Sequence, residues 1–209
     1  MWYLDLETAP RTDVYHLVPV GKAPSNFKDP AKIMAAIAEK RQKKIDLAAV
    51  SVDFGRIVVL GHGTGEDGVW HVPVFRTEDE ERAGLEEFWD EWAAQGSPVF
   101  CGFFASQFDV PMLVRRSYIL GVVPGVLELG RYKHPGVLDL AQELTFGWML
   151  DAEKLSTYAK VFGLPHDDTT EGSEMPGLIA AGEYTVVAEH CRCDLELTRS
   201  LAVALGLDR

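Results

Sequence analysis

The sequence has little cysteine and no long apolar run, and both absences narrow the class of protein. Three cysteines among 209 residues, two of them as Cys191-x-Cys193, are too few for a disulfide framework and lack zinc-site spacing. No stretch reaches the roughly 18 apolar residues of a membrane span. The N-terminus also lacks the basic and apolar regions of a signal peptide. We therefore expect a reduced, cytoplasmic protein without a membrane partner.

Basic residues are scarce as well, since 20 Lys and Arg stand against 32 Asp and Glu, a net charge of −12. This charge argues against a protein that coats nucleic acid through its overall field. It leaves room for an enzyme that binds nucleic acid locally, with metal ions supplying positive charge. Three basic clusters are candidates for phosphate contacts, or for ordinary solvated surface: Lys40-Arg41 with Lys43-Lys44, Arg115-Arg116, and Arg131-Tyr132-Lys133-His134.

The order of predicted elements indicates an α/β fold, with a mixed sheet and helices packed on it. The first strand alternates apolar and polar residues, and the second is wholly apolar and predicts a buried strand. A glycine-bounded turn at 65–68 predicts a hairpin that pairs the second strand with a third. The first strand lies at the centre if this hairpin and the fourth strand flank it. Predicted strands cover residues 2–8, 55–61, 69–75 and 98–102, and predicted helices cover 30–49, 78–94, 111–120 and 185–205.

Two carboxylates share one face of the first strand. Asp5 and Glu7 are two residues apart, so their side chains point the same way, about 6.6 Å apart. Leu4 and Leu6 face the opposite side and are expected to pack. Carboxylates this close repel each other unless a cation lies between them, and hard oxygen ligands suit Mg²⁺ or Mn²⁺. The plainer interpretation is an edge strand with a solvated polar face.

Two later segments add further acidic groups. Asp109 follows the strand at 98–102 and precedes a helix, where it either caps the helix or serves a site at the strand end. His190 and Asp194 are four residues apart and share a helix face. There His190 is a candidate general base beside a metal-binding carboxylate, or half of an exposed polar pair.

Taken in order, Asp5, Glu7, Asp109 and Asp194 resemble the motifs of the DEDD superfamily of 3′→5′ exonucleases. The resemblance extends over GRIVVLG, VLDLAQELTFG, KLSTYAKVFGLP and EGSEMPGLIAAGEYTVVAEHCRCDLELT, nearly the whole chain. The likeness is greatest to stand-alone exonucleases similar to the proofreading domain of family-B DNA polymerases. It implies a ribonuclease H-like fold with a central mixed five-stranded sheet, a single domain over 1–209, and a helical insertion at about 28–48.

The resemblance also implies a mechanism and a substrate. The four carboxylates would bind two divalent metal ions, Mg²⁺ or Mn²⁺, and His190 would orient or deprotonate the attacking water. The implied reaction is stepwise hydrolysis at the 3′ end of single-stranded DNA, releasing nucleoside monophosphates. An exoribonuclease and a catalytically weak subunit that only binds a 3′ end remain the alternatives. A DNA polymerase or a repair protein would be a partner in trans.

The chain departs from the family pattern at two places. His190 stands four residues before the last Asp, where related enzymes carry Tyr, and Tyr184 is too distant to replace it. A His base predicts activity that rises through roughly pH 6–7. Phe103 and Phe104 occupy the stretch where the family often has Asn before the second motif. They are expected either to stack on a terminal base or to belong to the core, and Asp139 is expected to support the site without binding metal.

Overall fold

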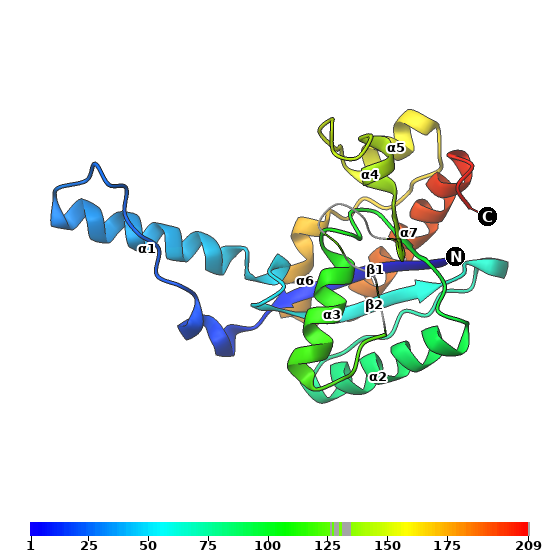
Figure 1. Ribbon diagram of the computed structural model, residues 1–209, viewed down its shortest axis with the longest axis horizontal. Helices are drawn as coiled ribbons and strands as arrows, with labels where there is room; N and C mark the ends of the chain where they lie inside the picture. Colours follow the sequence, from blue (N-terminus) through cyan, green and yellow to red (C-terminus); the bar gives the residue numbers. More distant parts are fainter. Residues whose placement is uncertain (126, 128–129, 131–134, 209) are drawn as a thin grey trace.

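The computed structural model describes residues 1–125, 127, 130 and 135–208 of the chain (Figure 1). Two layers of helices enclose a sheet, and one helix projects from the body. The strands are β1 (Trp2–Pro10), β2 (Gly55–Gly63), β3 (Phe100–Gly102) and β4 (Val137–Asp139). The α-helices are α1 (Pro30–Asp46), α2 (Glu78–Ala94), α3 (Asp109–Leu120), α4 (Leu140–Leu144), α5 (Leu155–Phe162), α6 (Met175–Ala181) and α7 (Tyr184–Ala204). Short 3-10 helices are η1 (Thr12–Leu17), η2 (Ala48–Val50), η3 (Glu66–Gly68) and η4 (Gly172–Glu174).

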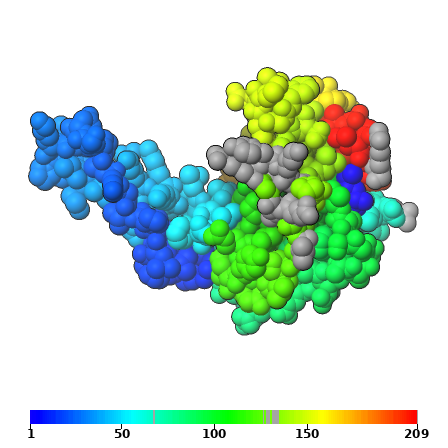
Figure 2. All heavy atoms as spheres, viewed as in Figure 1, coloured from blue at the N-terminus to red at the C-terminus, as the bar shows by residue number. Residues whose placement is uncertain are grey.

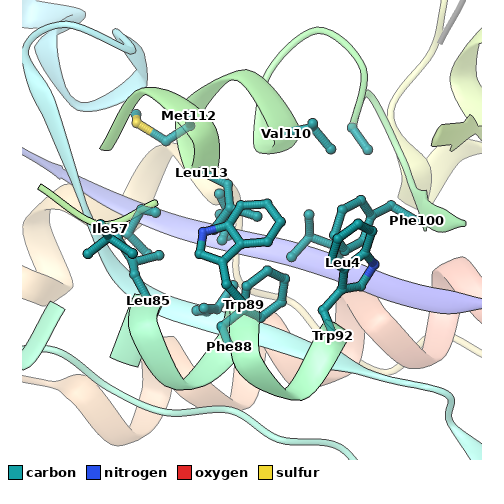
Figure 3. Close-up of a cluster of buried hydrophobic side chains, with 14 of the residues drawn as sticks. Leu4, Ile57, Leu85, Phe88, Trp89, Trp92, Phe100, Val110, Met112 and Leu113 are labelled. Carbon is teal, nitrogen blue, oxygen red and sulfur yellow. The ribbon is translucent and has the colours of Figure 1, made fainter. Parts of the chain in front are cut away.

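The sheet has the order β2-β1-β3-β4, which confirms the predicted α/β class and the central place of the first strand. β2 runs antiparallel to β1, whereas β3 and β4 continue the sheet in parallel. Leu4 and Leu6 enter the main core against α2 and α3, where Phe88, Trp89 and Phe100 also pack (Figure 3). The opposite face of β1 is covered by α6 and α7. Alternation along β1 therefore separates an apolar face from a face that carries Asp5 and Glu7.

The five-stranded sheet implied by the resemblance is not confirmed among the described residues, and the strand predicted at 69–75 is not one of the four that form the sheet. The segment that follows β2 lies alongside it, but only the pairs Val59–Val74 and His62–His71 form bridges, and both are isolated. Between them, the Leu60 amide donates to the Pro73 carbonyl at 3.2 Å. Pro73 has no N–H to return this hydrogen bond, so the ladder is interrupted and the predicted hairpin is reduced to two separate contacts.

Residues 11–50, which we call the arm, leave the sheet at the end of β1 and return at β2. Their longest element is α1, which projects from the body (Figures 1 and 2). Asp29 caps this helix by accepting a hydrogen bond from the Ala31 amide at 2.9 Å, and Pro30 begins it, as predicted. No side chain of α1 is buried. Within the described residues, no helix is both long and apolar enough to cross a membrane.

Candidate active site

The site begins on β1, where Asp5 and Glu7 point toward α7. Glu7 is only 8% exposed, although it carries a carboxylate. The thiol of Cys191, on α7, lies 3.7 Å from the backbone oxygen of Asp5, so the helix rests directly on this part of the strand. The sequence prediction that these two carboxylates share one face, opposite Leu4 and Leu6, agrees with this arrangement.

Close packing of α7 on the sheet depends on a glycine. A Cβ atom at Gly61 of β2 would lie 2.4 Å from the Cys191 sulfur and 2.7 Å from a methyl group of Leu195. Both distances are far inside van der Waals contact, so any larger residue would push the helix away from the sheet. The glycine thereby allows His190 and Asp194 to reach the carboxylates of β1.

His190 lies among three carboxylates. Its Nε2 atom is 3.7 Å from Glu7 Oε1 and 3.8 Å from Asp194 Oδ2, and its Nδ1 atom is 2.5 Å from Asp168 Oδ2. The imidazole is only 7% exposed. If Nδ1 donates its proton to Asp168, the lone pair of Nε2 faces the space between Glu7 and Asp194.

Asp109 reaches the site from the opposite side, as the first residue of α3, and is 4% exposed. The preceding turn is held by Asp139, whose carboxylate accepts hydrogen bonds from the amides of Phe104 and Ser106 and from the Ser106 hydroxyl. Asp139 also caps α4 by accepting from the Ala141 amide. Its side chain therefore joins β4 to the turn that positions Asp109, which is the supporting role expected from the sequence.

Burial and mutual repulsion raise the pKa of every carboxylate in the predicted ligand set. Burial, then the charge of Asp194, raises the pKa of Asp5 to about 7. Burial, followed by the neighbouring carboxylates, raises the pKa of Glu7 and of Asp109 well above their usual values. Burial also raises the pKa of Asp194. Cations that offset this repulsion favour the fully ionised form of such a group at neutral pH.

The donor set fits divalent metal ions. Asp5 Oδ2 is buried and has no hydrogen-bond partner among the described residues, so a ligating oxygen is available without breaking another contact. The four carboxylates supply hard oxygen donors of the kind that Mg²⁺ and Mn²⁺ prefer. In addition, donor atoms of Asp168, His190 and Asp194 all lie within 4.8 Å of one another.

Asp168 is the site residue that sequence reasoning missed. It lies in the loop between α5 and η4, and it bonds both the His190 ring and the Thr170 amide, the latter at 2.8 Å. Although burial alone raises the pKa of Asp168, hydrogen bonds from Thr170 and His190 outweigh it and lower that pKa. In the sequence this residue stands out only as part of the acidic pair Asp167-Asp168. No helical or strand period relates that pair to His190.

The two phenylalanines before Asp109 have different surroundings. Phe103 packs against the core cluster around Tyr3 and meets the ring of Tyr158 edge-on at 5.9 Å. Phe104 stacks on Trp148 with ring centroids 5.6 Å apart, and its φ of 60° places its backbone in the left-handed region. Of the two roles expected for these residues, packing in the core therefore fits Phe103. Both side chains are partly exposed, so stacking on a base stays a prediction for each of them.

The predicted phosphate contact at Arg116 is wrong. Its side chain is fully buried and donates to both carboxylate oxygens of Glu81, at 2.8 and 2.7 Å, and to Glu78 at 3.2 Å. These bonds tie α3 to α2, and Arg116 has no access to a substrate. Arg115 lies on the exposed side of the same helix and pairs with Asp53. The basic cluster predicted at 131–134 lies outside the described residues.

Comparison with known proteins shows the family to which the chain belongs. A family model described as a predicted 3′-5′ exonuclease related to the exonuclease domain of PolB matches residues 50–201. The family B DNA polymerase from the hyperthermophilic archaeon Pyrobaculum calidifontis shares 18% sequence identity with a TM-score of 0.65. That match covers 98% of this chain but 24% of the polymerase, so it shows the fold and spans about a quarter of that protein. Among curated proteins, none matches. Because the family match covers well over half of the sequence, the chain belongs to the predicted 3′-5′ exonucleases related to the exonuclease domain of PolB.

Proposed function

We propose that the protein is a metal-dependent 3′→5′ exonuclease that hydrolyses the terminal phosphodiester bond of single-stranded DNA. The observation that carries this proposal is a group of buried carboxylates beside one buried imidazole: Glu7 and Asp194 lie 3.7 and 3.8 Å from His190 Nε2, and the charges of Asp5 and Asp109 act on Glu7. Carboxylates with raised pKa values destabilise a protein when they ionise without bound cations. Membership in a family of predicted exonucleases gives such a group a role, which is catalysis.

Each side chain has a defined part in the reaction. The four carboxylates would hold two divalent ions, which supply a more acidic water and stabilise the negative charge of the leaving 3′ oxygen. His190 Nε2 accepts the proton of the attacking water, because it faces Glu7 and Asp194. Asp168 holds the opposite ring nitrogen and thereby fixes the tautomer and the ring orientation. The water oxygen bonds to phosphorus as the bond to the 3′ oxygen breaks.

A cleavage assay on labelled strands tests this proposal. We would incubate 5′-labelled single-stranded DNA with the protein and Mg²⁺ or Mn²⁺, beside RNA of the same sequence. A ladder of shortened products that disappears with the Asp194→Asn variant is the expected result. Shortening of RNA alone would move the substrate class to RNA. No shortening of either strand with either metal would overturn the proposed enzyme.

A further inference from the structure

The charge of the protein is divided unevenly between its arm and its body. The arm, residues 11–50, contains eight basic and four acidic residues, a net charge of +4. The remaining residues contain 12 basic and 28 acidic residues, a net charge of −16. An acidic body repels a polyanion, and the arm is the part of the chain whose charge attracts one.

The helix of the arm is packed loosely against the rest of the protein. α1 buries no side chain, and it is held to the loop that precedes it by hydrogen bonds from Arg41 to the Tyr15 carbonyl at 2.9 Å and from Lys40 to the Lys22 carbonyl at 2.8 Å. At 1.5 Å per residue its 17 residues extend about 25 Å. This length is about three times the Debye length of roughly 8 Å in physiological salt. The outer part of the arm projects away from the body (Figure 2), so salt screens it from the negative charge of the body.

The arm is joined directly to the catalytic strand. Pro10, where β1 ends, is three residues beyond Glu7, so the arm begins about 10 Å from the carboxylates. A stacked strand advances about 3.4 Å per nucleotide. The first three nucleotides from the 3′ end would thus fill the space between the site and the arm, and about seven more could follow α1.

We propose that the arm binds the phosphate backbone of the substrate strand, beginning about three nucleotides upstream of the 3′ end. This inference rests on the proposed function for the nature of the ligand and adds a binding site to it. The lysines that carry it are exposed along the arm: Lys28, Lys32 and Lys44. Apolar side chains such as Val20 and Met34 are exposed there too, so a second copy of the chain, with its acidic body, is the competing partner.

Neutralising these three lysines tests the proposal. The triple variant Lys28→Gln/Lys32→Gln/Lys44→Gln keeps the helix and removes three charges. The matched control replaces the same residues by Arg, which conserves the charge, and Arg82→Gln on α2 removes an exposed charge from the body. Circular dichroism should be alike for all variants, because none of these side chains is buried.

Binding is measured by fluorescence anisotropy with 20-nucleotide and 3-nucleotide single strands in EDTA, which prevents metal-dependent cleavage. For the 20-mer we expect the Gln variant to lose about tenfold or more in affinity at 0.15 M salt. A plot of log affinity against log salt concentration should become less steep by about 2 for this variant, since each of the three lost phosphate contacts contributes about 0.7 to the slope. The Arg variant and Arg82→Gln should bind like the wild type, and the 3-mer should not distinguish any of them.

Equal affinity and equal salt slope for the Gln variant and the wild type would overturn the proposal. So would a change from dimer to monomer in light scattering with unaltered DNA binding, because it would assign the arm to a second copy of the chain. A cleavage assay separates this inference from the proposed function. If the wild type binds the 20-mer through the arm but shortens neither this strand nor RNA of the same sequence with either metal, the exonuclease proposal fails and the binding site on the arm is retained.

Discussion

Replacing Asp5 by Asn should make the metal-free protein more stable at pH 8. The carboxyl of Asp5 has a pKa of about 7 in the folded state, because of burial and the charge of Asp194, against about 3.9 in the unfolded chain. A raised folded-state pKa means that stability is lost as pH rises from about 4 through about 7. At 1.4 kcal/mol per pKa unit, the raised pKa lowers the stability of the folded protein by up to about 4 kcal/mol at pH 8 and by about 1–2 kcal/mol at pH 5.

Asparagine has nearly the same shape as aspartate and cannot ionise, so most of this cost should disappear in the variant. A gain of about 3 kcal/mol corresponds to a rise of roughly 6–12 °C in Tm for a protein of this size. Differential scanning fluorimetry in EDTA would measure it at pH 5 and pH 8. With Mn²⁺ at pH 8 the difference should shrink or reverse, because bound cations stabilise the wild type more. Asp151→Asn, at an exposed carboxylate, is the control and should show no such dependence on pH or metal.

Two results would refute this reasoning. One is an Asp5→Asn variant that is no more stable than the wild type in EDTA at pH 8. The other is a gain as large at pH 5 as at pH 8, which would show that ionisation of Asp5 is not the source. Either result would mean that the carboxylates are not crowded enough to require cations.

Three further changes test the arrangement of the site. Asp168→Asn should lower kcat on single-stranded DNA by about 10–100-fold with little change in KM, since it removes the acceptor that orients His190; an unchanged kcat would exclude this positioning role. Gly61→Ala should destabilise the protein by about 1–3 kcal/mol in urea unfolding, because the new methyl group overlaps α7. Arg116→Ala should cost about 3–5 kcal/mol by leaving Glu81 buried without its cation. In that variant, DNA affinity of the folded protein should not change, and a specific loss would contradict the buried position of Arg116.

Short-range patterns in the sequence were sufficient to predict much of the secondary structure. Alternation predicted that Leu4 enters the core while Asp5 and Glu7 face the other side, because a strand repeats every two residues. The helix predicted from residue 30 does begin there, because Asp29 caps it and Pro30 suits the first helical position. Pro73 interrupts the pairing opposite β2 because it has no N–H. The proline is visible in the sequence, but its position opposite Leu60 is seen only in the structure.

Residue type and spacing alone could not decide which polar groups meet. Arg115 and Arg116 look equivalent in the sequence, yet a rotation of about 100° per residue turns one outward and buries the other against Glu81. Asp168 joins His190 from a loop 22 residues earlier in the chain, a distance that no helical or strand period connects. The sequence by itself determined the α/β class of the fold, because that class follows from short-range periodicity, and it led to a predicted ligand set through the family motifs. Only the tertiary structure decided which side chain orients the imidazole and which arginine is buried, because these depend on how helices pack across the sheet.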